Sequence, residues 1–490
     1  MRDELVLVKD IKKTILYVDK MLINFPRSEK ILRDKINDTS FEILELVYFS
    51  NLLETHERII YQKKIISKIK MLDFYFKIAC DKKYISYKKY MKLGSFLLNM
   101  IKQIHGWIRY EKVNNLYRQI SMGDMLRLYQ KQVKVNTKNK HKIYKFEEYF
   151  TANITNVYYM FGNHNYKVSD YNIFLIRNPK YRIIMSQKMN DKIINHVMAD
   201  YLIQVLDSCL VDTNVATRKN KGTHYGMRYF KKYLNELKGN TIYALKFDIS
   251  KYFYHIDHKI LKQMLQKKIK DKAYLNILFQ IIDSTNENVN ERIMKIKRKE
   301  IKKLQMSTMH DRDKRIREIE NIPLYQYGKG LPIGNMTSQI MAVFYLNDLD
   351  HYIKEQLHAK YYIRYMDDGV ILSNDKEYLK WCLKKIRKMV NQYQLTLNKK
   401  TCMMNVSKNG IDFLGFHYYI INQKVIMKVR KITKKRLRQK MKRLEYLYCQ
   451  KKVSKKDIEQ VIASYQGHLK YGNTYFLRKK YLKNMEKKVS

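Results

Sequence analysis

Two adjacent carboxylates, Asp367 and Asp368, stand between short apolar runs in the stretch YYIRYMDDGVIL (361–372). Like charges at this distance repel, and each raises the pKa of the other, so a divalent cation is the expected compensating partner. A third carboxylate, Asp248, ends the apolar run ALKFD (244–248). Carboxylates from separate strands that meet at one end of a sheet can hold the two ions of a two-metal phosphoryl transfer. The three residues therefore predict such a site.

The elements that must position these carboxylates are short strands. ALKFDI (244–249) is an apolar run suited to a buried strand, and helix-like sequence follows it. YYIRY (361–365) and GVILS (369–373) are typical of two strands joined in a β-hairpin, with the Asp pair at its turn. From about residue 170 onward, the pattern predicts a mixture of helices and strands.

The N-terminal part is predicted to be helical. Apolar residues recur at three- and four-residue spacing in FEILELVYFSNLLE (41–54) and in YMKLGSFLLNMIKQIHGWI (90–108). Pro26 and the stretch DKKYIS (81–86) separate the helical blocks, which indicates a four-helix bundle over residues 1–112. The polar, Lys-rich residues that follow, 113–165, are predicted to be a basic connector.

Charge and cysteine content narrow the class of protein. The chain has 98 Lys and Arg against 46 Asp and Glu, a formal net charge of +52, which favours a polyanionic partner such as nucleic acid; a Lys-rich compositional bias is the alternative explanation. The five cysteines form no CxxC pair, which argues against a disulfide framework or a structural zinc site. No apolar run suits a signal peptide or a membrane span. We expect a soluble, cytoplasmic protein that does not enter a membrane.

Several motifs in succession identify a family. YMDDGVIL (365–372), with FDISKYFYHIDH (247–258) before it and DFLGFHYY (412–419) after it, resembles the palm of a reverse transcriptase. GLPIGNMTSQIMAVFYLNDLD (330–350) and LTLNKKT (395–401) follow the order of that family.

This resemblance covers about residues 170–480 and implies an α+β fold, a right-hand polymerase with fingers, palm and thumb behind the N-terminal all-α bundle. Fingers and palm would span residues 166–427, including a charged insertion at about 287–322 that is either an exposed helical segment or a basic arm. A basic helical thumb would span 428–490. We see no RNase H-like or endonuclease sequence after it.

The resemblance also implies roles for single residues in the palm. Asp248 and Asp367 would be the main ligands of two Mg²⁺ ions, with Mn²⁺ as the alternative ion, and Asp368 and the backbone carbonyl of Ile249 would complete the metal site beside them. Further implied roles are a ribose 2′-OH block at Phe253, primer-end contacts at Tyr365 and Met366, and a general acid near the pyrophosphate at Lys400, with Lys399 as the alternative.

The fingers are expected in NPKYRIIMSQKMNDKIINHV (178–197) and VATRKNKGTHYGMRYF (215–230). Arg182, Arg218 and Lys221 are candidates to hold the triphosphate of the nucleotide, because guanidinium and ammonium groups suit phosphate oxygens. Gly222 would let the backbone turn beneath them.

One departure from the family pattern concerns fidelity. Many reverse transcriptases have Gln before the Gly of the LPxG motif, whereas this chain has Ile333 before Gly334. The string LPIGNMTSQ, which ends in Gln339, resembles the enzymes of diversity-generating retroelements and their bacterial relatives. Loss of a polar contact near the nucleotide predicts low or biased fidelity.

The N-terminal bundle has its own resemblance. FPRSEKILRDKI (25–36), LDFYFKIACDKKYIS (72–86) and IHGWIRYE (104–111) are similar to the small four-helix accessory protein of those retroelements. That family is basic, oligomeric and binds nucleic acid, which implies a homo-oligomer formed through the bundle.

The function implied is synthesis of cDNA from deoxynucleotides on an RNA template, with a dedicated non-coding RNA as template and antiphage defence as the favoured setting. The alternatives are a diversity-generating retroelement enzyme, template-independent or homopolymer DNA synthesis, and, from a different class, an inactive RNA-binding scaffold. The primer stays open between RNA, DNA and a protein hydroxyl.

Overall fold

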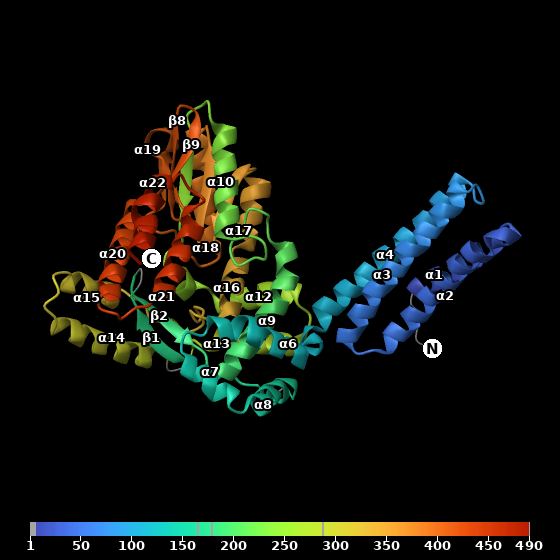
Figure 1. Cartoon of the computed structure of the whole chain (residues 1–490), viewed down its shortest axis with the longest axis horizontal. Coiled ribbons are helices and arrows are strands. Elements are labelled where there is room, and N and C mark those ends of the chain that lie inside the picture. The colour runs from blue at the N-terminus through green and yellow to red at the C-terminus, as the bar shows by residue number, and fades with distance from the viewer. Residues whose placement is uncertain (1–5, 164–165, 178–179, 287–288, 490) are drawn as a thin grey trace. The chain divides into compact units, whose positions relative to one another are not determined.

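The computed structural model describes residues 6–163, 166–177, 180–286 and 289–489. The chain divides into two compact units, of which the first comprises residues 1–171, 187–205 and 262–281 and the second comprises 172–186, 206–261 and 282–490 (Figure 1). Residues 1–5, 164–165, 178–179, 287–288 and 490, which belong to ranges predicted above, lie outside the described residues. In the part of the chain that is described, no helix is long and apolar enough to cross a membrane.

The first unit begins with four long helices whose apolar faces share one core. Each helix packs on the next, and the fourth returns to the first. Ser86 caps the last of them by accepting a hydrogen bond from the backbone N–H of Lys89, as N-terminal serines commonly do. Fully buried Ile36, Ile65 and Phe76 are part of the core. The helices are α1 (Val6–Leu22), α2 (Lys30–Leu52), α3 (Thr55–Asp81) and α4 (Tyr87–Asn114), with the 3₁₀ turn η1 (Arg27–Glu29) before α2.

The region predicted to be a basic connector is instead folded. It is helical over most of its length and buries Met125, Tyr129 and Val157. The prediction missed this because the apolar residues are spaced at the helical period among many lysines, so composition hides them. The helices are α5 (Leu116–Gln119), α6 (Met122–Leu128), the π-helix η2 (Tyr129–Lys134), α7 (Lys140–Glu147) and α8 (Phe150–Gly162). The rest of the unit is formed by α9 (Met189–Leu206), α12 (His258–Lys268) and α13 (Lys272–Asp283). Each of these three helices also has one or more residues that belong to the second unit.

The second unit contains three antiparallel sheets. The central sheet has the strand order β4-β5-β3-β6, so β3, which precedes Asp248, lies between β5 and β6. Its strands are β3 (Tyr243–Phe247), β4 (Tyr361–Tyr365), β5 (Asp368–Ser373) and β6 (Cys402–Asn405). The hairpin β1 (Asn172–Ile176) and β2 (Arg182–Ser186) forms a second sheet, and β7 (Ile411–Phe413), β8 (Phe416–Ile421) and β9 (Lys424–Val429) form a third.

Helices complete the second unit. The predicted charged insertion forms two helices, α14 (Val289–Gln305) and α15 (Arg312–Glu320), that pack against each other. Three further helices are next to strands of the central sheet in the sequence: α10 (Thr223–Leu237) precedes β3, α11 (Tyr252–His255) follows β3, and α18 (Lys376–Gln392) follows β5. The remaining helices are η3 (Asp207–Cys209), α16 (Met336–Tyr345), α17 (Asn347–His351), η4 (Tyr352–Gln356), α19 (Val406–Asn409), α20 (Lys431–Cys449), α21 (Lys455–Leu469), α22 (Tyr475–Arg478), η5 (Lys479–Lys483) and α23 (Asn484–Val489).

The predicted fold class is confirmed: helices and strands are mixed, and the N-terminal region up to β1 is entirely helical where it is described. The strands expected at 244–249, 361–365 and 369–373 are β3, β4 and β5.

Candidate active site

The central sheet brings the three predicted carboxylates together at one end. Asp248 directly follows β3, Asp367 lies in the tight turn from β4 to β5, and Asp368 is the first residue of β5. In the antiparallel pairing of β3 with β5, Phe247 lies opposite Gly369. Asp248 follows Phe247 and Asp368 precedes Gly369, so the carboxylates of the two predicted stretches meet at the same end of the sheet.

Asp367 is half-buried and lies close to Asp248. Burial and the neighbouring Asp248 carboxylate, with which its side chain hydrogen-bonds, raise the pKa of Asp367 to about 7. A carboxyl with such a pKa is a place where positive charge would be stabilised, because the cation would remove the repulsion that holds the proton on.

Asp368 has a different environment, although it is adjacent. Its Oδ2 lies 3.2 Å from Nζ of Lys246 on β3. Burial raises the pKa of Asp368, and the ammonium group of Lys246 acts in the opposite direction. Among the described residues, the other oxygen, Oδ1, is buried and has no hydrogen-bond partner. A buried carboxylate oxygen with no donor is a site that a cation would satisfy.

These observations fit a divalent cation bound mainly by Asp248 and Asp367. The described part of the chain contains no group of three or more His, Cys, Asp or Glu side chains that could hold a metal by itself. An ion here would therefore depend on backbone oxygen, water or substrate phosphate as well, which is how Mg²⁺ is commonly bound.

The backbone at Ile249 suits that requirement. The N–H of Asn398 donates to the carbonyl of Asp248 over 2.7 Å, and the N–H of Ser250 donates to the carbonyl of Thr396 over 2.9 Å. These two bonds flank the pair Ile249–Leu397, which makes it a non-hydrogen-bonded pair of an antiparallel bridge. The carbonyl of Ile249 is thus not used in this pairing.

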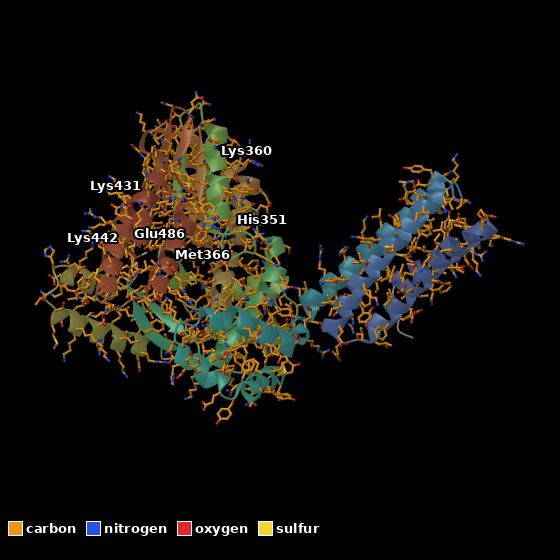
Figure 2. The ribbon with its side chains drawn as sticks, viewed as in Figure 1. His351, Lys360, Met366, Lys431, Lys442 and Glu486 are labelled. Atoms are coloured by element: carbon orange, nitrogen blue, oxygen red, sulfur yellow. The ribbon has the colours of Figure 1, made fainter. Side chains whose placement is uncertain are left out.

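The turn itself is conformationally restrained. Met366, which is labelled in Figure 2, has φ +56°, in the left-handed region that residues with a Cβ rarely adopt. Gly369, the second residue of β5, lies close to Phe247: a Cβ at position 369 would meet the Phe247 ring at 2.3 Å. Glycine is required there because the ring covers the backbone of the strand.

The residues predicted to surround the nucleotide sugar lie on short elements after β3 and before α16. Phe253 is half-buried on α11, between the buried Tyr252 and Tyr254. It is more exposed than a core aromatic residue, which is compatible with a surface that meets a substrate.

The loop before α16 packs tightly on β2. The N–H of Met185 donates to the carbonyl of Ile333 over 2.8 Å. Gly334 has φ +134°, and a Cβ there would lie 2.8 Å from the carbonyl oxygen of Met185, so glycine is needed for the close approach. Gln339, half-buried on α16, lies one turn further along.

Arg182, on β2, is exposed. Burial raises the pKa of Tyr254 to about 12, and the positive charge of Arg182 acts against that increase, so the two side chains are near each other. The guanidinium of Arg182 is accessible to a ligand.

Arg218 is placed differently from the other basic candidates. Its side chain is 5% exposed, and its Nε lies 2.5 Å from Oδ1 of Asp207. Its terminal nitrogens donate to the carbonyls of Asp207, Val211 and Asn214. These bonds give Arg218 a structural function in this loop, and its predicted contact with the triphosphate would require them to be exchanged.

Lys221 and Gly222 lie at the start of α10. Nζ of Lys221 donates to the Asp212 carboxylate over 2.9 Å, and this ion pair lowers the pKa of Asp212. Asp212 is 86% exposed, so phosphate could replace it as partner. Gly222 has φ +125°, a conformation that favours glycine.

Lys400, in the segment before β6, is exposed. Its backbone N–H donates to the side-chain oxygen of Asn398 over 3.1 Å. The amide nitrogen of Asn398 in turn donates to the Asp248 carboxylate over 3.0 Å. Lys399 is exposed as well, so the structure leaves the choice between the two lysines open.

Sequence reasoning missed the residues that support the carboxylates. Lys246 and Asn398 contact Asp368 and Asp248 directly, and Arg364 bonds the turn through its guanidinium. Lys246 stands two residues before Asp248, on the same face of the strand, which is a signal in the sequence that could have identified it.

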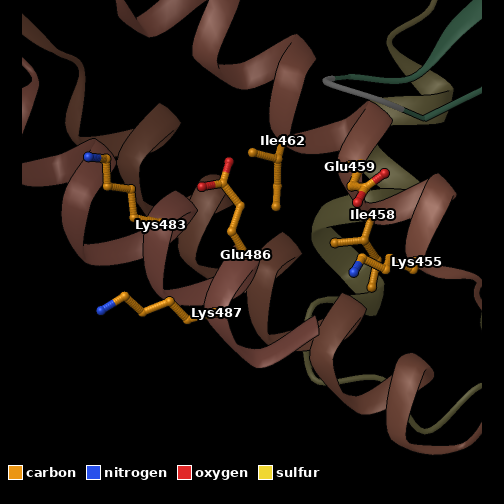
Figure 3. A pocket seen from close by; sticks show the side chains of 7 residues that line it. All are labelled: Lys455, Ile458, Glu459, Ile462, Lys483, Glu486 and Lys487. Carbon is orange, nitrogen blue, oxygen red and sulfur yellow. The ribbon is translucent and has the colours of Figure 1, made fainter. Parts of the chain in front are cut away.

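A further surface lies on the C-terminal helices. α20 presents eight exposed Lys and Arg side chains, of which Lys431 and Lys442 are labelled in Figure 2. A hollow of about 380 Å³ in this region has a lining without any of the predicted site residues (Figure 3). Its lining residues are Lys455, Ile458, Glu459, Ile462, Lys483, Glu486 and Lys487.

Comparison with known proteins shows that the three carboxylates lie within a range that matches a protein family. Residues 176–418 match the family model described as reverse transcriptase (RNA-dependent DNA polymerase). Among solved structures, an apo telomerase from Candida tropicalis is similar at 13% sequence identity with a TM-score of 0.36, over 85% of this chain and 78% of that chain. No curated protein matches the chain at a significant level.

Proposed function

We propose that this chain, which is an RNA-directed DNA polymerase by virtue of its reverse transcriptase domain at residues 176–418, makes cDNA on a dedicated non-coding RNA by two-metal nucleotidyl transfer. The observation that carries the proposal is the cluster of Asp248, Asp367 and Asp368, in which burial and mutual repulsion raise the pKa of Asp367 to about 7. Such a cluster is stabilised when cations bind.

The residues of the proposed site would have different roles. Asp248, Asp367 and the carbonyl of Ile249 would hold the metal, and Lys246 would keep Asp368 in place beside them. Divalent ions bound there would lower the pKa of a primer 3′-hydroxyl and stabilise the leaving pyrophosphate.

Other residues would position the nucleotide. Arg182 and Lys221 would bind phosphate oxygens through charge-assisted hydrogen bonds. Phe253 would exclude a ribose 2′-OH by filling its volume. Gly334, which allows the loop of Ile333 to approach β2, would set the surface beneath the base pair.

The basic helices would bind the nucleic acid. The eight exposed cations of α20 can neutralise phosphates of a template–primer duplex without reading its sequence. The four-helix bundle would mediate self-association and RNA binding, which rests on its sequence resemblance to a retroelement accessory protein. We propose antiphage defence as the setting, and cells that express the catalytic variant described next should lose any protection from phage.

The test is DNA synthesis by the purified protein with its co-purified RNA. Mg²⁺ is supplied with each deoxynucleotide singly and with all four, and the products are sequenced. Asp367→Asn should lower synthesis by at least about a hundredfold, because it removes a charge that acts at the reacting centre. The matched control is Asp313→Asn, the same change at a side chain on α15 that is 72% exposed, which should retain full synthesis.

The products distinguish the alternatives. A sequence complementary to the bound RNA supports templated copying, whereas a single-base run would indicate homopolymer synthesis. RNA binding without any metal-dependent product would contradict the proposal and support an inactive scaffold.

A further inference from the structure

A buried ion pair contacts the turn that carries the catalytic carboxylates. Arg364 on β4 and Asp350 on α17 are both 0% exposed. Nε of Arg364 donates to Oδ1 of Asp350 over 2.7 Å, and Nη2 donates to Oδ2. A two-point contact of this kind fixes the orientation of the guanidinium plane.

The carboxylate of Asp350 is itself held from other sides. Oη of Tyr362 donates to Oδ1 over 2.6 Å, and Nδ2 of Asn214 lies 3.2 Å from Oδ2. Both oxygens of Asp350 are therefore shared between Arg364 and a second donor, which leaves the carboxylate little freedom to rotate.

The same guanidinium reaches the catalytic turn. Nη1 of Arg364 donates to the backbone carbonyl of Met366, the residue directly before Asp367. Nη2 also donates to the carbonyl of Val343 on α16 over 3.0 Å. Arg364 thus connects the turn to two helices.

The bond to Met366 acts where the backbone is strained. Met366 has φ +56°, a left-handed conformation that is unfavourable for a residue with a Cβ. A turn in this conformation is retained only when its surroundings hold it. Desolvating two charges is also costly, and hydrophobic replacements of buried ion pairs are often neutral for stability. The strain and the buried pair together indicate a function in placement rather than in stability.

We propose that Arg364, oriented by Asp350, is a positioning residue for the reaction: it fixes the carbonyl of Met366 and thereby the direction in which Asp367 presents its carboxylate to Asp248. This inference rests on the proposed function, since it assigns a support to the site that would perform it. Arg364 touches neither substrate nor metal, so its effect passes through the backbone of the turn.

The test compares Arg364→Lys with Tyr362→Phe in the full chain. Lysine retains the charge opposite Asp350 but cannot contact Asp350 and Met366 together, whereas Tyr362→Phe removes one bond to the same carboxylate and leaves the bond to Met366. Three quantities are measured: kcat and KM for the deoxynucleotide, Mn²⁺ binding by electron paramagnetic resonance without substrate, and the melting temperature. The values of kcat and the amount of Mn²⁺ bound are normalised to the folded fraction at the assay temperature.

Arg364→Lys should lower kcat by about a hundredfold, the effect of a displacement of about 1 Å at a reacting centre. KM for the nucleotide should change by less than about twofold, because the residue acts on the chemical step and not on binding. Mn²⁺ affinity should fall by about tenfold, as it does when a group that orients a metal ligand is lost. Tyr362→Phe should keep kcat and Mn²⁺ affinity within about twofold of wild type, even where its melting temperature falls as much as that of Arg364→Lys.

A loss of melting temperature in Arg364→Lys with kcat and Mn²⁺ affinity unchanged would overturn the inference and leave Arg364 a structural residue. Wild-type protein that binds Mn²⁺ but makes no DNA would contradict the proposed function separately. In that case a weaker Mn²⁺ affinity in Arg364→Lys than in Tyr362→Phe would still support the positioning of Asp367.

Discussion

At the scale of single residues, the two adjacent aspartates of the turn are made different by their neighbours. Asp367 faces another carboxylate, Asp248, and its pKa is raised to about 7, whereas Asp368 is paired with the ammonium group of Lys246. Identical side chains at consecutive positions therefore differ in their electrostatic surroundings, with a carboxylate as the neighbour of one and an ammonium group as the neighbour of the other.

The raised pKa of Asp367 predicts how stability depends on pH. Its folded value of about 7 lies above the value of about 3.9 in an unfolded chain, so the folded protein binds an extra proton between these two pH values. The carboxyl therefore destabilises the metal-free fold progressively as pH rises from about 4 to about 7.

Without metal, Asp367→Asn should match wild type in melting temperature near pH 4 and exceed it at pH 8. Adding Mg²⁺ at pH 8 should raise the melting temperature of wild type and not that of the variant. Calorimetry across this pH range, with and without chelator, measures both effects. A difference between the two proteins that is the same at every pH would disprove this assignment.

The three aspartates could be singled out from the sequence, because they stand in a local pattern of short apolar runs and turn residues. The supports could not. Asp350 is fourteen positions from Arg364 and lies on a different element, so their pairing depends on how α17 packs, which no local spacing records.

At the scale of elements, the loop before α16, which we propose to lie beneath the incoming nucleotide, packs on β2. Ile333 uses its backbone carbonyl to bond Met185, so its side chain can be changed without loss of that bond. This makes position 333 suitable for testing fidelity.

Ile333→Gln should lower misincorporation several-fold, because a polar side chain next to the incoming nucleotide discriminates base-pair geometry through hydrogen bonds that an apolar one cannot make. Single-nucleotide misincorporation assays measure the effect, with Leu324→Gln, a change at a side chain that is 37% exposed, as control. Unchanged error rates in Ile333→Gln would count against a role of this residue in fidelity.

The strands were predictable as elements since each is a short apolar run next to turn residues. The helices between α4 and β1 were not, because their buried residues, such as Tyr129 and Phe146, are separated by many lysines that give the segment the composition of a linker.

At the scale of the whole molecule, the net charge of +52 favours nucleic acid binding, while the bundle offers a different kind of surface. Phe41, Tyr48 and Leu52 recur on one face of α2 and are 51%, 46% and 84% exposed. An apolar stripe of this kind is expected to be covered by another molecule, and we predict a second copy of the chain.

Phe41→Glu combined with Leu52→Glu should therefore convert an oligomer to a monomer, with the melting temperature nearly unchanged because both side chains are exposed. Analytical ultracentrifugation of the full chain measures the state. Lys35→Glu, at an exposed position on another face of α2, is the control and should leave the oligomer intact. A wild-type chain that sediments as a monomer would refute self-association.

The helical hairpin of α14 and α15 separates the proposed catalytic residues along the chain. Asp248 precedes it, Asp367 follows it, and the segment between its helices, 306–311, is largely exposed. A gene divided at this segment would encode two polypeptides, of which one carries Asp248 and the other carries Asp367 and Asp368. We expect neither polypeptide to polymerise alone. Fusion partners that bind each other would rejoin the two fragments, and their binding would then switch on DNA synthesis in a cell.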